Sequence, residues 1–156
     1  MAEDLWTFSN RIYRAEGVAA ACIDLQDRHG LDVNMLLFCC WAGVELGRLP
    51  ESTLVDADAI SAPWSENVVG PIRHARRWLK ANRGESPLRD QIRSIELDAE
   101  RREQHELEAF ANSIEGVGPG PDAVESNVET WLTRSGVELD DLDRRTLDRV
   151  LAATSA

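Results

Sequence analysis

Cysteines are few in this sequence, long apolar runs are absent, and each shortage excludes a class of protein. The sequence has three cysteines, Cys22, Cys39 and Cys40, and their odd number argues against a disulfide-stapled secreted domain. They form no C-x-x-C pair, which argues against a metal site. The longest uncharged apolar run, residues 35–44, holds ten residues, whereas a membrane span needs about 20. The acidic start of the chain also differs from a signal peptide. We therefore expect a cytoplasmic protein with no membrane anchor, metal or cofactor.

Positive charge is also scarce, since 17 Lys and Arg face 28 Asp and Glu for a net charge of -11. This excess repels polyanions, which argues against nucleic acid and anionic membranes as partners. The charge is uneven, however. Residues 71–102 hold 9 basic and 5 acidic side chains, a net of +4, while the segments on either side are acidic. The total charge therefore excludes polyanions only if this basic segment is neutralised within the fold.

Apolar residues recur at helical spacing along the whole chain, which predicts an all-α, compact multi-helix bundle. The helix expected over residues 32–47 is apolar on nearly every side, so we place it at the centre. Residues 50–63 read as a loop with one helical turn, and Pro63 suits the first position of the helix that follows. The other helices are expected over residues 4–14, 18–29, 63–83, 86–114, 122–134 and 140–153.

A Gly/Pro-rich segment at residues 116–121 reads as a linker. It divides the chain into a helical bundle domain over 1–115 and a C-terminal helical hairpin over 122–156. The hairpin is too short to fold alone, so we expect it to dock on the bundle. Asp122 and Glu125 suit a capping box at its start.

Polar residues gather around the turn at Gly30, and they have two interpretations. Asp32 suits the N-cap of the central helix, and the others suit hydrogen bonds to exposed backbone at two helix ends. Alternatively the group binds a small ligand, which requires Gln26 or Asn34 to be buried and to face a cavity. The candidate ligand-binding residues are Gln26, Asp27, Asp32 and Asn34.

Basic residues follow one arc of the helix expected over 63–83, within roughly 120° of its circumference. The arc can bind an anion, nucleic acid or an acidic protein, or it can be neutralised by carboxylates of neighbouring helices. Its members are Arg73, Arg76, Arg77, Lys80 and Arg83.

Aromatic residues make up only 6% of the chain, yet 5 of them are tryptophans. Trp6 and Trp64 stand at expected helix starts, where a half-exposed indole can anchor a partner. Trp41 and Trp78 lie on apolar arcs, so we expect both in the core.

The ordered residues Leu25-Gln26-Asp27, Gly30, Asp32-Val33-Asn34 and Leu36-Leu37 resemble a family of small proteobacterial helical proteins known only as a domain of unknown function. The resemblance covers about residues 4–80. It implies a bacterial cytosolic helical protein, and it brings no activity, cofactor or catalytic residue with it.

No catalytic motif is present in the sequence, so no catalytic residue is named. The composition favours a non-catalytic protein-interaction or regulatory module whose protein partner is unidentified. It would bind through the basic arc, through Trp6 and Trp64, or through the amphipathic C-terminal helices. The alternatives are a small-ligand-binding protein or enzyme with a site near Gly30, and a nucleic-acid contact through residues 73–83.

Overall fold

The computed structural model describes residues 3–115, 118 and 120–155. These residues form helices throughout, and within them the only extended pairing is an isolated bridge between Gly47 and Gly118. The expected all-α multi-helix bundle is therefore confirmed. The helices are α1 (Leu5–Arg14), α2 (Val18–His29), α3 (Val33–Glu45), α4 (Glu51–Trp64), the π-helical segment η1 (Ser65–Val69), α5 (Gly70–Arg83), α6 (Pro87–Ala111), α7 (Ala123–Arg134) and α8 (Asp141–Thr154).

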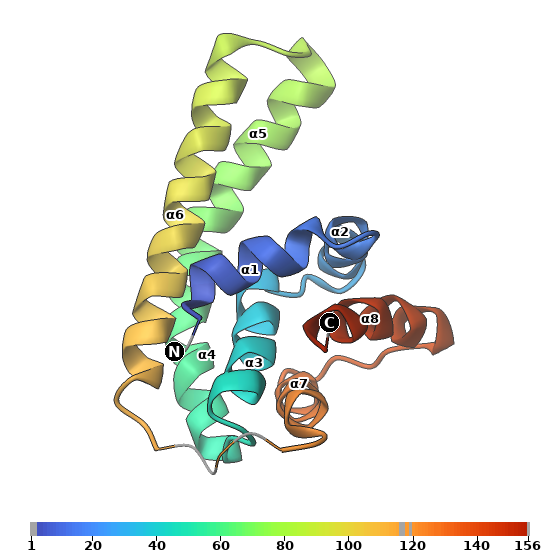
Figure 1. The fold of residues 1–156 in the computed structure, drawn as a ribbon. Coiled ribbons are helices and arrows are strands. Elements are labelled where there is room, and N and C mark those ends of the chain that lie inside the picture. The colour runs from blue at the N-terminus through green and yellow to red at the C-terminus, as the bar shows by residue number, and fades with distance from the viewer. Residues whose placement is uncertain (1–2, 116–117, 119, 156) are drawn as a thin grey trace.

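Helix α3 lies at the centre of the bundle, as its apolar sequence predicts (Figure 1). Every residue from Asn34 to Gly43 is buried, and the helix packs against α1, α4, α6, α7 and α8. Asp32 caps its N-terminus, because its Oδ1 accepts hydrogen bonds from the backbone N–H groups of Asn34 and Met35. Asn34 is thereby fixed in the first turn of the central helix.

Helices α7 and α8 pack against α3 and α2, and their apolar residues join the same core. Asn127 of α7 is fully buried at this contact. Its Oδ1 accepts a hydrogen bond from Leu49 N–H at 2.8 Å, and its Nδ2 donates to the Gly47 carbonyl at 3.1 Å. These bonds satisfy backbone groups where the chain leaves α3. Residues 116, 117 and 119 of the expected linker lie outside the described residues, and the division at residue 115 stays a prediction.

Helix α5 and the half of α6 that faces it, residues 70–100, form a two-helix arm that projects from the bundle (Figure 1). Helix α4, η1 and α5 run on continuously from Glu51 to Arg83, so the arm is an extension of the bundle and not a separate unit. No residue of α5, all of which the structure describes, is buried. One face of the arm lies toward α1 and α2, and we call it the inner face (Figure 1). The opposite face, the outer face, lies toward solvent.

The prediction of a loop over residues 50–63 was wrong, since α4 spans Glu51–Trp64 with Pro63 inside it. Leu54, Ala57 and Ser61 are buried at helical spacing, and this packing outweighs the local cost of the proline. The π-helical turn follows, and Gly70 N–H donates to the Ser65 carbonyl at its end. A Cβ at Gly70 would lie 2.5 Å from that carbonyl oxygen, so glycine permits the wider turn.

Two further expectations were wrong. Trp78 is 48% exposed and not in the core, because it belongs to α5, a helix of the arm in which no residue is buried. Asp122 adopts a left-handed conformation with φ 67° and, among the described residues, its side chain caps no helix N–H. The capping box belongs instead to α8, where Asp140 and Asp143 bond each other's backbone N–H groups.

Candidate functional site: a cleft between the arm and the bundle

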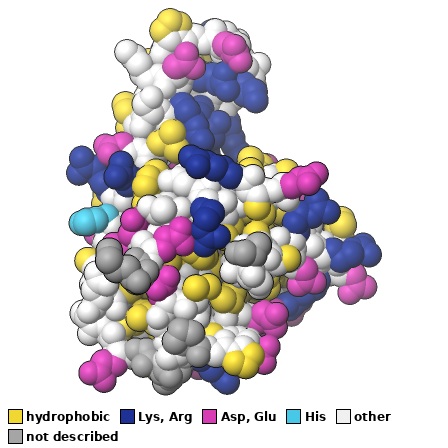
Figure 2. Space-filling model, in the orientation of Figure 1, with side chains coloured by type: hydrophobic (Ala, Val, Ile, Leu, Met, Phe, Trp, Pro, Cys, Tyr) yellow, Lys and Arg dark blue, Asp and Glu magenta, His cyan; other side chains and the backbone are white. Residues whose placement is uncertain are grey.

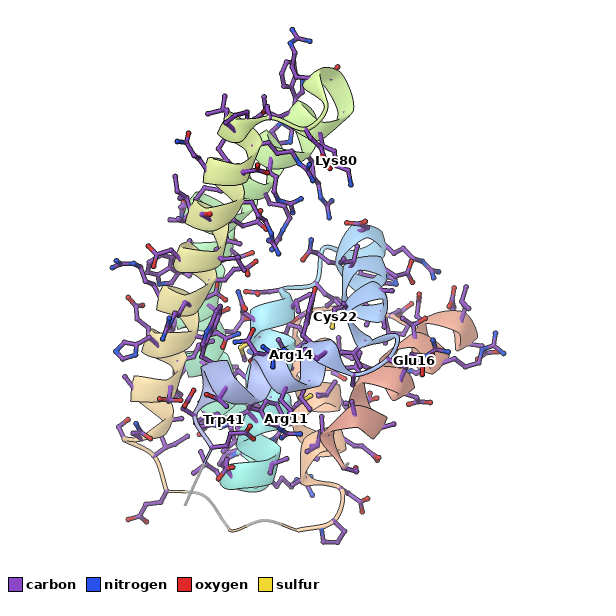
Figure 3. All side chains as sticks on the ribbon, turned by 45° about the horizontal axis from the view of Figure 1, so that its top comes forward. Arg11, Arg14, Glu16, Cys22, Trp41 and Lys80 are labelled. Carbon is purple, nitrogen blue, oxygen red and sulfur yellow. The ribbon has the colours of Figure 1, made fainter. Side chains whose placement is uncertain are left out.

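A cleft of about 610 Å³ lies between the inner face of the arm and helices α1, α2 and α3. Lys and Arg side chains gather along the arm beside it (Figure 2), and Lys80 points from α5 toward the side where α2 lies (Figure 3). The cleft brings together residues that the sequence suggested for two separate sites. These are Gln26, Asp27 and Asn34 from the turn cluster, and Arg73, Arg76, Arg77 and Lys80 from the basic arc, with Trp6 beside them.

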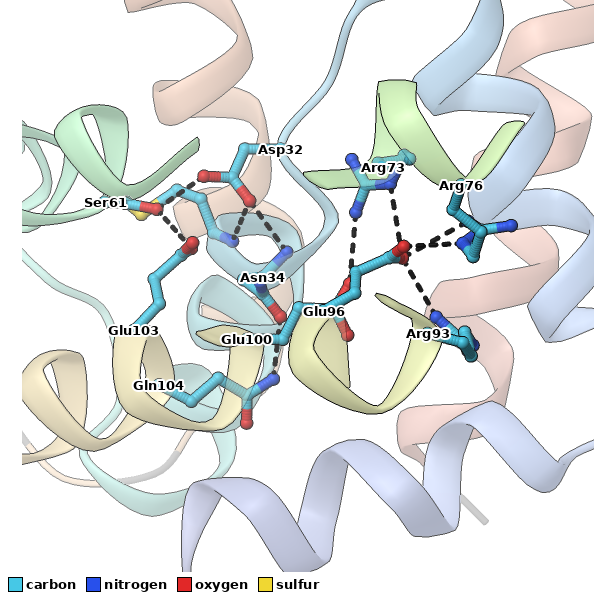
Figure 4. A network of polar contacts seen from close by, with 11 residues as sticks. Asp32, Asn34, Ser61, Arg73, Arg76, Arg93, Glu96, Glu100, Glu103 and Gln104 are labelled. Atoms are coloured by element: carbon cyan, nitrogen blue, oxygen red, sulfur yellow. Dashed lines mark hydrogen bonds and ion pairs between the residues drawn. The ribbon is translucent and has the colours of Figure 1, made fainter. Parts of the chain in front are cut away.

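Buried polar groups form the floor of the cleft. Asn34 is 6% exposed, and its Oδ1 accepts a hydrogen bond from Gln104 Nε2 at 3.0 Å (Figure 4). Gln104 and Ser9 are 2% and 5% exposed and also line the cleft. Within the described part of the chain, Gln104 Oε1 and Ser9 Oγ have no hydrogen-bond partner. Asn34 is therefore buried and faces a cavity, as a ligand site near Gly30 requires.

A cluster of arginines around Glu96 forms the wall of the cleft on the arm (Figure 4). Glu96 is only 1% exposed, and it accepts two hydrogen bonds from Arg76, at 2.6 and 3.2 Å, and one from Arg93 at 2.9 Å. Arg73 lies 3.7 Å from the same carboxylate and 3.1 Å from Glu100. Burial raises the pKa of Glu100, and Arg73 opposes this effect. Three guanidinium groups thus share two carboxylates.

An ion pair closes one end of the cleft, because Arg77 of the arm lies 2.8 Å from Asp27 of α2. Lys80 also lines the cleft, and none of the described carboxylates lies within ion-pair distance of it. Arg83 is outside the cleft, where its guanidinium group stacks 5.2 Å from the Trp78 ring. Part of the basic arc is therefore neutralised within the fold, while Lys80 remains available to an anion.

Asp32 lies behind the floor and does not line the cleft. Ser61 Oγ is 2.6 Å from Asp32 Oδ2 and 2.8 Å from Glu103 Oε2 (Figure 4). A hydroxyl has one proton to donate, so one of these contacts needs a proton from a carboxyl group. Burial and the nearby charge of Asp32 raise the pKa of Glu103 to about 9. Burial raises the pKa of Asp32 as well, so the two carboxyl groups hold one proton between them across Ser61.

The two tryptophans proposed as binding anchors lie apart. Trp6 lines the cleft with Tyr13, and the Arg101 guanidinium group lies 5.6 Å from the Trp6 ring. Trp64 ends α4 and does not line the cleft, and its Nε1 donates to Glu106 at 2.9 Å. Only Trp6 belongs to the candidate site.

The cysteines pack as small apolar residues and take no part in the site. Cys22, Cys39 and Cys40 are free and buried. Burial raises the pKa of the Cys22 thiol to about 12, so it stays protonated at neutral pH.

Sequence reasoning missed the rest of the lining, which includes Ser9 of α1 and Arg93, Glu96 and Gln104 of α6. A signal was present for α6. Ala99, Glu103 and Leu107 follow at four-residue spacing and all three are buried, so the polar stretch around Glu103 faces inward. No comparable signal marks Ser9, whose burial depends on the tertiary packing of α1.

Comparison with known protein families gives a match. A family model described as a protein of unknown function, DUF2390, matches residues 4–107. No curated protein and no solved structure matches the chain. The matched segment reaches further than the expected 4–80 and includes every residue that lines the cleft. In the part of the chain that the structure describes, no helix has both the length and the apolar character that crossing a bilayer demands.

Proposed function

The chain belongs to DUF2390, a family of proteins of unknown function, and we propose that it binds a small polar ligand in the cleft between the arm and the bundle. The observation that carries this proposal is the pair of buried oxygens on the floor, Gln104 Oε1 and Ser9 Oγ, that lack partners among the described residues. A buried polar atom without a partner costs about 1–3 kcal/mol. Both atoms are covered in this structure, so a ligand that shifts the neighbouring side chains and donates hydrogen bonds to these oxygens would recover that free energy.

The size and lining of the cleft support this role. Small-molecule sites usually measure roughly 300–1,000 Å³ and combine apolar walls with a few convergent polar groups. The cleft measures about 610 Å³, and Val33, Leu37 and Leu97 line it beside the polar floor. The functional alternative that the sequence placed near Gly30 is thus favoured over a nucleic-acid contact, because three residues of the basic arc are paired within the fold.

A protein-interaction module is the second candidate, and exposed apolar residues of the arm favour it. Trp78, Leu88 and Ile95 are large apolar residues of the arm that are 48–56% exposed. Exposed apolar surface is typical of protein contacts. We place the protein in the cytoplasm, since three free thiols suit a reducing compartment.

The test fills the cleft with a bulky side chain and asks whether a ligand is lost. Leu97 lines the cleft and is 40% exposed, so Leu97→Trp adds volume there with little cost to the core. Leu88→Trp is the matched control, because Leu88 lies on the same helix and does not line the cleft. Each protein is incubated with a pool of small metabolites, desalted and analysed by native mass spectrometry.

We expect the wild-type protein and Leu88→Trp to retain the same compound and Leu97→Trp to lose it. Retention by all three proteins would place the ligand elsewhere and overturn the proposal. Retention by none of them would overturn it as well.

A further inference from the structure

Resting on the proposed function, we infer the chemical class of the ligand: a planar heteroaromatic ring that carries an anionic group, about the size of a nucleoside monophosphate. The anionic group would lie against Lys80 and the arginines of the arm, and the ring against Trp6 above the amide of Gln104. The two ends of the cleft differ in chemistry, and each end supports one half of this inference.

The arm end of the cleft has unbalanced positive charge. Arg73, Arg76 and Arg93 share only Glu96 and Glu100, which leaves one positive charge in excess. Arg77 and Asp27 balance each other, and Lys80 adds a second positive charge. Guanidinium groups left partly unpaired in a cleft bind phosphate or carboxylate, often through two parallel hydrogen bonds.

The opposite end of the cleft has the groups that recognise a planar ring. Trp6 and Gln104 both line the cleft and also line a neighbouring hollow together, so they lie side by side. An indole provides a stacking surface for a flat ring. Side-chain amides pair with the hydrogen-bonding edges of nucleobases. Gln104 Oε1 accepts hydrogen bonds and, among the described groups, has no donor of its own.

The distance between the two ends fits one small molecule. Trp6 and Tyr13 both line the cleft from α1, and seven residues of helix span about 10 Å. Tyr13 lies at the arm end, within electrostatic reach of Arg73 and Arg93. A ligand that spans from Trp6 to these arginines therefore has about the length of a nucleoside monophosphate.

The direct test is calorimetric titration of the full chain at constant ionic strength. The ligands are the 5′-monophosphates of adenosine, guanosine, cytidine and uridine, with nicotinate as a heteroaromatic carboxylate. The matching nucleosides supply the ring alone, and inorganic phosphate supplies the anion alone. We expect at least one ring-bearing anion to bind about tenfold or more tightly than either part. Nicotinate is too short to span from Trp6 to the arginines, so we expect it to bind more weakly than the tightest-binding monophosphate.

Two pairs of variants test which end of the cleft binds the anionic group and which end binds the ring. Lys80→Glu reverses a charge inside the cleft, and Arg83→Glu makes the same change on the same helix outside it. Trp6→Ala removes the indole of the cleft, and Trp64→Ala removes one elsewhere. We expect Lys80→Glu and Trp6→Ala each to weaken binding by about tenfold, while Arg83→Glu and Trp64→Ala leave it unchanged.

Three results would overturn the inference. They are no binding of any ring-bearing anion, equal binding of inorganic phosphate and the monophosphates, and equal effects of Lys80→Glu and Arg83→Glu. The proposed function is tested separately. If the metabolite pool yields a ligand that Leu97→Trp loses but that lacks a ring or an anion, the inference fails and the proposed function stands.

Discussion

Helix α6 has an unusual number of buried polar side chains, and each is stabilised in a different way. Glu96 accepts hydrogen bonds from arginines, Glu103 shares protons with Ser61 and Asp32, and Gln104 bonds the amide of Asn34. Partners of this kind offset the free-energy cost of burying a polar group. These contacts therefore fix the rotation of α6 against α3 and α4, and with it the position of the cleft floor.

The buried acid Glu103 makes stability depend on pH. The folded protein keeps the Glu103 proton until about pH 9, whereas an unfolded chain loses it near the ordinary value of 4.5. The stability that the protonated Glu103 contributes to the fold is therefore fully present below pH 4.5, and it is lost as the pH rises toward 9. We expect the free energy of unfolding to fall between pH 6 and 9 by as much as about 1.4 kcal/mol per pH unit. Urea titrations at several pH values measure this slope.

The variant Glu103→Gln isolates this group, because an amide keeps the shape and cannot ionise. Its stability should vary little between pH 6 and 9. Glu106→Gln, at an exposed position of the same helix, should keep the wild-type slope. A wild-type slope near zero over this range would show that Glu103 is ionised in the folded protein.

At the scale of elements, the connection from α3 to α4 and the connection from α6 to α7 cross at a close backbone contact. Gly118 N–H donates to the Leu46 carbonyl at 2.9 Å. Gly47 beside it has φ +95°, and a Cβ there would lie 2.0 Å from the Gly118 carbonyl oxygen. Both the backbone conformation and the space at this position require glycine.

Substitution of Gly47 should therefore destabilise the protein through two effects. Gly47→Ala adds strain at a positive φ and forces apart the two chain segments that cross there. We therefore expect the free energy of unfolding to fall by roughly 3 kcal/mol. Gly30→Ala is the control, because Gly30 has φ +66° and no neighbouring atom within 4 Å of the new Cβ. It should cost only about 1 kcal/mol. Equal losses in chemical denaturation would exclude the steric effect.

Helix ends and the central helix were predictable from the sequence, because their signals are local. Asp32 caps its helix as expected, and Gly30 ends α2 in the left-handed conformation. The apolar circumference of residues 33–45 also correctly predicted a buried helix. Local capping chemistry and burial pattern both point to the same structure at these positions.

The arm and the cleft were not predictable in this way. The basic arc and the turn cluster were each visible in the sequence, but their meeting depends on the direction in which the arm leaves the bundle. The continuous helix through Pro63 determines that direction, and the local preference of proline argued against such a helix. Exposure of Trp78 follows from the same geometry.

At the scale of the whole molecule, a basic arm projects from an acidic body. Residues 71–102 have a net charge of +4 in a chain of net charge -11. Side-chain ion pairs join the two helices of the arm at Glu96 and Glu100, and one links the arm to α2 at Asp27. Because no residue of α5 is buried, these pairs supply an important part of the arm's local stability. We infer that the arm opens more readily than the core.

Hydrogen exchange with a charge-neutral variant tests this view of the arm. Glu96→Gln leaves three arginines around a neutral amide, so α5 should lose contacts to α6 while the core keeps its own. We expect amides of α5 to exchange about tenfold to a hundredfold faster, since a hydrogen bond to a charged group contributes about 1.5–3 kcal/mol. Amides of α3 should not change. Glu85→Gln is the control, because this carboxylate is 91% exposed and pairs only with Arg89, and it should have no effect. Equal acceleration of α3 and α5 in Glu96→Gln would mean that the arm and the core unfold together, and the arm would then lack an opening of its own.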